Sequence, residues 1–281
     1  MNNPGLFQAR WNLGKLVLCN LLPLALLGFW LWPTGQALCT VFDEWLFHHL
    51  NAPLASNSTW LHIWAVASLR PFDIVVGLIM LGLLIRGDWV FKAVDVRRAF
   101  FGFLSILILM VVIRALFSKL VAVMNWQHNS PSMVLEGAVH MSDYFPGWEK
   151  TWELKDRSSQ SFPGDHASVL LIWGLFMGIF SRSIGQFLIV WGLTLLFMMP
   201  RLVAGAHWGQ DDYIGGVLLA VLALGWGYYT PYAARMSNFL LRLTHPLFNL
   251  LSRMPVLSRM SVVRASSCLL YTSDAADDLL C

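Results

Sequence analysis

Residues Phe100 to Ile113 read FFGFLSILILMVVI, a run in which Ser105 carries the only polar side chain. A helix needs about 20 mainly apolar residues to cross a bilayer, so this run can span one if it borrows part of its neighbour, Ala115 to Met124. Five more segments are similarly apolar: Leu16 to Trp32, Phe72 to Ile85, Ala167 to Phe180, Ile184 to Met199 and Tyr213 to Tyr232. The sequence therefore predicts an all-α, polytopic membrane bundle of about six transmembrane helices.

The composition of the chain excludes a water-soluble domain. Of the 281 residues, 57% are hydrophobic and 12% are charged, and the mean hydropathy is +0.60. Soluble domains carry about 25% charged residues, and their cores cannot bury this many apolar side chains. The first apolar run follows Arg10 and Lys15, as a secretory signal would, but the segment Thr34 to Cys39 is a poor cleavage site. We therefore expect a retained first helix.

We expect residues 1–267 to form a single membrane-embedded domain. The segment Cys268 to Asp277, CLLYTSDAAD, resembles the translation of a sequencing adapter. Residues 268–281 are therefore expected not to be native protein, with a natural polar tail as the alternative. Without them, Cys19 and Cys39 are the cysteines that remain, and their positions fit neither a metal site nor a disulfide framework.

The orientation of the bundle follows from its basic loops, because Lys and Arg are retained on the cytoplasmic side. The basic residues fall on alternate sides of consecutive spans: Arg10 and Lys15, then Arg86, Lys92, Arg97 and Arg98, then Arg182, then Arg235, Arg242, Arg253 and Arg259. This pattern predicts cytoplasmic termini, with segments 33–59, 125–166 and 200–212 outside. Val41 to Leu50 mixes aromatic and charged residues, which fits a surface helix at the outer headgroups or a loop helix packed on the bundle.

Ionisable side chains are costly in or near hydrocarbon, and two groups of them fall on the predicted outer side. One is Ser161 to His166, SFPGDH, directly before the fourth apolar segment. The other comprises Arg201, His207 and Asp211, between the fifth and sixth segments. Because both groups are expected on one side, they can share a pocket at the membrane surface.

These residue types suit phosphoryl transfer through a covalent enzyme, which needs a nucleophile, a cation for the phosphate oxygens and an acid for the leaving oxygen. If the sixth helix starts near His207, Asp211 lies one turn further on and can fix the tautomer of the imidazole. Arg201 offers a planar fork for phosphate oxygens. Gly164 before a helix leaves free backbone N–H groups for an anion, and His166 in the first turn can donate a proton.

Each of these residues also has a simpler explanation. A single interfacial histidine more often contacts headgroups than catalyses a reaction, and Arg201 could be an anchor that reaches the interface. An Arg-x5-His-x3-Asp match alone is weak evidence. Its occurrence together with Pro-Gly-Asp-His on one predicted face is what favours catalysis.

Pro163-Gly164-Asp165-His166 followed by Arg201-x5-His207-x3-Asp211 resembles motifs two and three of the type 2 phosphatidic acid phosphatase superfamily of integral membrane enzymes. The resemblance implies that His207 is the nucleophile that forms a phosphohistidine, that Asp211 is its partner and that His166 is the general acid. It also implies that Arg201 and Gly164 bind phosphate. No metal and no other cofactor is expected.

Within that superfamily, Lys155-Asp156, the earlier Ser130-Pro131 and the second motif are most similar to the bacterial lipid A 1-diphosphate synthase branch. Enzymes of that branch move a phosphate from undecaprenyl diphosphate to the 1-phosphate of lipid A at the periplasmic face. The resemblance thus implies lipid substrates and a location in the bacterial inner membrane, with no nucleic-acid partner.

Two departures from the family pattern matter. The second motif commonly reads Pro-Ser-Gly-His, whereas Gly164 and Asp165 fill the middle places here and add a negative charge beside the phosphate. The first motif, Lys-x6-Arg-Pro, is absent, so another cation is expected to bind phosphate. Lys155 is the candidate, with Arg157 and Lys119 in reserve, although ordinary headgroup contact explains all three equally well.

Two other functions fit the same residues. With water as acceptor, the site would be that of a lipid phosphatase acting on undecaprenyl diphosphate or phosphatidylglycerol phosphate, because transfer and hydrolysis share every step up to the phosphoenzyme. A non-catalytic lipid-binding or transport protein could use a basic outer rim for headgroups alone. The pairing of His207 with Asp211 argues against it, since headgroup binding needs only charge.

The remaining polar residues carry less information. Asp73 and Arg70 could pair with one another or with the pocket, but solvation at the interface explains them as well. The histidines outside the two motifs have no ligand-like spacing: His48, His49, His62, His128, His140 and His245.

Overall fold

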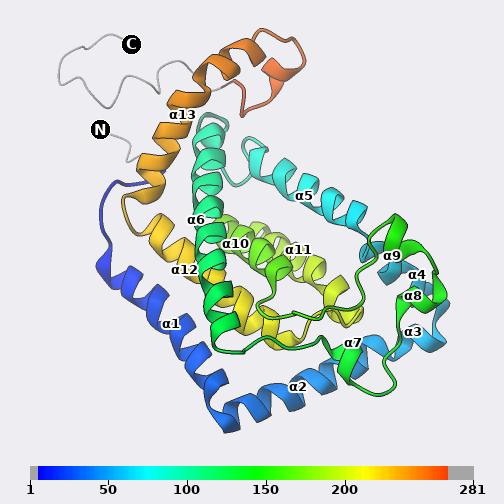
Figure 1. The fold of residues 1–281 in the computed structure, drawn as a ribbon. Coiled ribbons are helices and arrows are strands. Elements are labelled where there is room, and N and C mark those ends of the chain that lie inside the picture. The colour runs from blue at the N-terminus through cyan, green and yellow to red at the C-terminus, as the bar shows by residue number, and fades with distance from the viewer. Residues whose placement is uncertain (1–5, 265–281) are drawn as a thin grey trace, which may run out of the picture.

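The computed structural model describes residues 6–264, and within them every regular element is helical apart from one isolated bridge between Gly87 and Phe91 (Figure 1). The predicted all-α class is therefore confirmed. Residues 268–281, expected not to be native protein, lie outside the described residues.

The predicted apolar segments lie within helices, except for Trp32 and for residues 229–231, which interrupt the segment Tyr213 to Tyr232. The helices of the bundle are α1 (Leu13–Leu31), α5 (Arg70–Ile85), α6 (Val96–Val123), α10 (Asp165–Phe180), α11 (Ile184–Val203), η2 (Asp211–Gly216) with α12 (Val217–Tyr228), and α13 (Tyr232–Leu251). The run that begins at Phe100 does extend through its neighbour, because α6 continues to Val123. In Figure 1, α10 lies in the middle of the bundle, and Trp173 and Phe176 on it are buried.

Within residues 6–264, three helical segments are long and apolar enough to cross a bilayer, namely α1, residues 93–123 and α11. Two bent pairs pass the same test together: α4 (Ser58–Ala67) with α5, bent by 69°, and Asp211–Tyr228 with α13, bent by 76°. The described chain thus has three to five candidate spans where about six were predicted. The predicted segment that does not pass this test is the fourth, α10, which has 16 residues and is packed against α6, α11 and α12.

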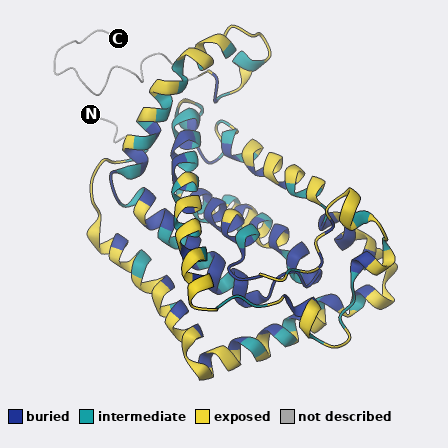
Figure 2. Cartoon of the chain, in the orientation of Figure 1, coloured by how far each residue is buried: buried dark blue, intermediate teal, exposed yellow. Residues whose placement is uncertain are grey.

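The outer faces of the long helices are apolar. Exposed side chains include Leu18 and Leu21 on α1 and Leu188 and Leu195 on α11 (Figure 2). Large contiguous apolar surface is rare on soluble monomers, whereas lipid tails can cover it. Together with the candidate spans, these faces identify a multi-pass membrane protein.

One end of the bundle is covered by α2 and by several shorter helices. Their bounds are α2 (Pro33–Asn51), α3 (Pro53–Ser56), α4, α7 (Pro131–Val134), α8 (Met141–Tyr144) and α9 (Trp148–Thr151). Val41 to Leu50 form part of α2, which packs on the bundle through one of its faces; a location at the outer headgroups stays a prediction. Asp43 and Phe47 are buried against the bundle, while Phe42 and Trp45 are exposed.

The basic segments meet at the other end of the bundle. Gln186 beside Arg182 donates to the carbonyl of Trp89 in the loop before α6, at 2.9 Å. At the same end of the molecule, the backbone N–H of Asn12 donates to the carbonyl of Tyr229, also at 2.9 Å (Figure 1). The alternation of basic loops along the sequence predicts that these loops lie at one end of the bundle. The orientation of that end toward the cytoplasm stays a prediction.

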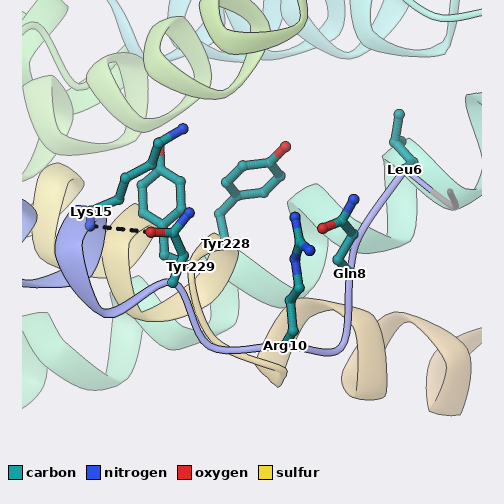
Figure 3. A pocket seen from close by; sticks show the side chains of 7 residues that line it. Leu6, Gln8, Arg10, Lys15, Tyr228 and Tyr229 are labelled. Atoms are coloured by element: carbon teal, nitrogen blue, oxygen red, sulfur yellow. Dashed lines mark hydrogen bonds between the residues drawn. The ribbon is translucent and has the colours of Figure 1, made fainter.

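A cavity of about 230 Å³ opens at the N-terminal end of α1 (Figure 3). Its lining residues are Leu6, Gln8, Arg10, Asn12, Lys15, Tyr228 and Tyr229. They include no histidine and no carboxylate, and α12 separates them from the predicted catalytic groups, which lie at its other end. This cavity therefore does not hold the phosphoryl-transfer chemistry.

Candidate active site

The end of α11 brings His207 back beside Arg201. The N–H of Ala206 donates to the carbonyl of Arg201 at 2.9 Å, and that of Gly205 to Leu202 at 3.1 Å, the pair of bonds of a Schellman motif. Gly205 has a φ of +71°, and a Cβ there would lie 2.5 Å from the ring of Phe47. Glycine is therefore needed for the turn.

His207 lies just before the next helical segment, which begins at Gly209, close to the start that the sequence analysis considered. A π-helical stretch, Asp211–Gly216, lies near the start of that segment, and such stretches occur often at functional sites. The expected contact forms, with His207 Nδ1 3.3 Å from Asp211 Oδ2. The same oxygen accepts from the backbone N–H of Trp208 at 2.8 Å.

The geometry of His207 suits a nucleophile. With a proton on Nδ1 shared with Asp211, the lone pair of a neutral ring is on Nε2, which lies 3.9 Å from Asp165 Oδ1. Burial lowers the pKa of His207, but the hydrogen bond with Asp211 and the neighbouring carboxyl groups raise it by more. The net direction is upward, so activity that needs neutral His207 is expected to fall as the pH drops.

His166 and Arg201 are linked through Asp73 of α5. His166 Nε2 lies 3.1 Å from the carbonyl of Phe197, so this nitrogen is the donor, and Nδ1 faces Asp73 Oδ1 at 3.9 Å. Arg201 Nη2 donates to Asp73 Oδ2 at 2.5 Å, and Nη1 to the carbonyl of Ser68 at 3.0 Å. The sequence left Asp73 unassigned; the structure places it in the site.

The N–H of Gly164 itself is not free to bind an anion. Its N–H donates to the carbonyl of Asp211 at 2.9 Å. A Cβ at this position would lie 2.5 Å from Asp212 Oδ1 and 2.8 Å from the Asp211 carbonyl. Glycine is needed here because the start of α10 packs tightly against η2, and that packing holds His166 and His207 in one site.

The three lysine and arginine candidates for a second phosphate cation have different surroundings. The backbone N–H of Lys155 donates at 3.2 Å to the carbonyl of Ser68, which also accepts from Arg201, while the Lys155 side chain is exposed. Arg157 pairs with acidic residues of its own loop. Lys119 is exposed on α6.

Arg114 on α6 is a cation that sequence reasoning missed. Its Nη2 lies 2.7 Å from Asp165 Oδ2, and the other oxygen of that carboxylate faces His207 Nε2. The carboxylate of Asp165 therefore lies between Arg114 and His207, the predicted nucleophile. An arginine within the apolar run of α6 is costly, and that cost was the available signal.

His128 was missed as well. Its Nε2 lies 2.9 Å from Asp211 Oδ1, so two histidines share the carboxylate of Asp211. Among residues 6–264, no group of three or more His, Cys, Asp or Glu side chains is arranged to hold a metal ion. Independence from metal stays a prediction.

Comparison with known proteins places this site in a family. The profile of the PAP2 superfamily matches residues 103–236, which include Arg114, His128 and both motifs. The chain is also similar to lipid A 1-diphosphate synthase of Escherichia coli (strain K12), with 29% identity over 230 residues, 81% of this chain and 92% of that protein. No solved structure matches the chain significantly.

Proposed function

We propose that this chain, which matches the PAP2 superfamily of lipid phosphatases and phosphotransferases over residues 103–236, moves a phosphoryl group from a polyprenyl diphosphate to lipid A 1-phosphate through a phosphohistidine. The observation that carries the proposal is the oriented His207, whose Nδ1 contacts Asp211 while Nε2 faces Asp165 Oδ1 at 3.9 Å. Similarity over nearly the whole length of a relative named for lipid A diphosphate synthesis favours this acceptor.

The proposed reaction has two displacements at phosphorus. In the first, the lone pair on His207 Nε2 attacks the terminal phosphorus of the diphosphate and the bond to the bridging oxygen breaks. His166 acts as an imidazolium: it keeps the proton on Nε2 and gives the one on Nδ1 to that oxygen, and the polyprenyl monophosphate leaves. In the second, a hydroxyl of the lipid A 1-phosphate gives its proton to Nδ1 of His166 and its oxygen attacks the same phosphorus; the N–P bond breaks, and His207 and protonated His166 are regenerated.

The cations of the site hold the transferred group. Arg201 is fixed by Ser68 and Asp73, and the remaining N–H groups of its guanidinium are available to phosphate oxygens. We propose that Arg114 replaces the missing first motif. Its partner Asp165 faces both Arg114 and His207, so a phosphoryl group that reaches Nε2 takes the place of the Asp165 carboxylate on Arg114.

Arg114→Gln is expected to lower kcat/KM for the diphosphate donor by roughly 10- to 100-fold, the usual worth of a charge-assisted hydrogen bond. Matched changes of the other candidates, Lys119→Gln and Lys155→Gln, should leave kcat/KM within about threefold, since both side chains are exposed. Steady-state kinetics on the three purified variants shows which of these cations binds the donor phosphate. A large loss in Lys155→Gln with none in Arg114→Gln would reverse the assignment.

Transfer and hydrolysis are separated by an assay with undecaprenyl diphosphate labelled in its terminal phosphate. With lipid A present, the purified protein should move the label to lipid A, and little free phosphate should appear. The His207→Ala variant is the control for background. Release of free phosphate at the same rate with and without lipid A would identify a lipid phosphatase instead.

The proposed face of the reaction is the periplasmic one, which rests on the alternation of basic loops. Cysteines placed at Lys155 and Gln210, near the site, are then expected to react with an impermeant thiol reagent in spheroplasts. A cysteine at Arg182, at the opposite end, should not react. The reverse pattern would put the site in the cytoplasm and remove lipid A from the proposal.

A further inference from the structure

His128 contacts the catalytic machinery from outside both sequence motifs. It lies between α6 and α7, and its ring reaches the carboxylate that orients His207. Nε2 is 2.9 Å from Asp211 Oδ1, and Nδ1 is 3.2 Å from the carbonyl oxygen of Trp126. The side chain of His128 is 27% exposed, while that of Asp211 is fully buried.

These two contacts determine the charge of the ring. A backbone carbonyl can only accept a hydrogen bond, and an ionised carboxylate can only accept one. Both nitrogens of His128 therefore face acceptors, an arrangement that favours the doubly protonated imidazolium. His207 differs, because its Nδ1 meets Asp211 while its Nε2 lies 3.9 Å from Asp165 Oδ1, too far for a hydrogen bond.

We propose that His128 is a positioning residue, whose imidazolium fixes the Asp211 carboxylate and offsets its charge, so that Asp211 stabilises protonated His207 less and more of His207 stays in its neutral, nucleophilic form. The inference rests on the proposed phosphohistidine function and adds a residue to it. Three groups contact the carboxylate of Asp211: the rings of His128 and His207, and the backbone N–H of Trp208, which donates at 2.8 Å. One carboxylate oxygen thus remains directed at His207 Nδ1.

The surrounding charges explain why an offset is needed. Carboxyl groups reach this cluster from three elements: Asp43 from α2, Asp165 from α10, and Asp211 and Asp212 from η2. Burial raises the pKa of Asp43 to about 7, so it is only partly ionised at neutral pH. Among the basic groups, Arg114 is paired with Asp165, whereas His128 contacts Asp211 directly, on the oxygen that His207 does not contact.

Loss of the positive charge of His128 is expected to raise the pKa of His207. Removing a positive charge beside Asp211 lets the carboxylate act fully on His207, which stabilises protonated His207 and raises its pKa. A charge at this range shifts a pKa by about one unit or more. Well below both pKa values, kcat/KM should then be about tenfold lower than in the wild type, whereas above both values the two proteins should be alike.

His128→Gln is the main test, because glutamine keeps a neutral N–H donor but loses the charge. In the purified full-length chain, ¹³C-histidine NMR should show a rise of about one unit in the pKa of His207, with the signal assigned by its loss in His207→Gln. The pH profile of kcat/KM should shift by the same amount. His62→Gln, at an exposed histidine bonded only within α4, should change neither.

A second variant separates charge from folding. His128→Arg keeps a positive charge at a partly exposed position, so both the NMR titration and the pH profile should return toward the wild type. An unchanged His207 pKa in His128→Gln would overturn the inference, whether or not any lipid is turned over. A raised His207 pKa in a protein that transfers no phosphate would instead uphold the charge balance and refute the proposed function.

Discussion

The His207→Ala variant is expected to lose phosphoryl transfer by about 10⁵-fold or more, to the level of the background reaction. In the described chain, the Nδ1 of His207 is oriented by the carboxylate of Asp211, which leaves the lone pair of the neutral ring on Nε2. His166 is proposed to have a different role, because its Nδ1 faces Asp73 beside Arg201 and is the nitrogen expected to donate the proton. Initial rates with a labelled diphosphate donor measure the loss.

His49→Ala is the matched control for that variant. His49 lies on α2, and its exposed ring is bonded only to the carbonyl of Trp45 one turn earlier. Full activity is expected after this change. His207→Gln provides a second test, since its amide can still contact Asp211 without offering a nucleophile; if either change at His207 retained more than about 1% of the wild-type rate, another group would have to attack the phosphorus.

His166→Ala is expected to slow turnover of the diphosphate donor by roughly 10²- to 10⁴-fold, the usual contribution of a general acid. The ring is held at Nε2 by Phe197, which leaves Nδ1 on the side of Asp73 and Arg201 as the nitrogen that can carry the transferred proton. Comparison of two donors measures this role. An activated aryl phosphate, whose leaving group needs no proton, should lose far less.

The ratio between the two donors is the informative quantity. A variant that is merely misfolded loses both activities equally, whereas loss of the acid affects mainly the natural donor. Equal losses of more than about 100-fold for both donors would therefore remove His166 as the general acid and leave it a structural role.

The bundle was predictable because runs of apolar residues set the length and number of its helices. The bends were not predicted, although their causes are visible afterwards. The break between α4 and α5 precedes Pro71 at the start of α5, and the break between α12 and α13 contains Pro231. Proline disfavours continuation of a helix through the residue before it. How far each helix turns at its break depends on the packing of its neighbours.

The candidate site was predictable only as far as its motifs extend. His207 with Asp211, and His166 with Asp165, each lie within a few residues of one another, so short-range geometry brings them together. Asp73, Arg114 and His128 come from other elements and reach the site through packing, which no spacing in the sequence reveals. The sequence singled out Gly164 as a phosphate ligand. In the structure its N–H donates to the carbonyl of Asp211, and the absence of a Cβ allows α10 to pack against η2.

The account depends most on a covalent phosphate on His207, and that bond can be measured directly. Brief mixing of the purified protein with a diphosphate donor labelled in its terminal phosphate, followed by quenching, should leave label on the protein that is labile in acid and stable in base. Mass spectrometry should place it on the peptide that contains His207, and His207→Ala should carry none. Equal labelling of the wild type and His207→Ala would contradict the mechanism, and with it the assignment of this site.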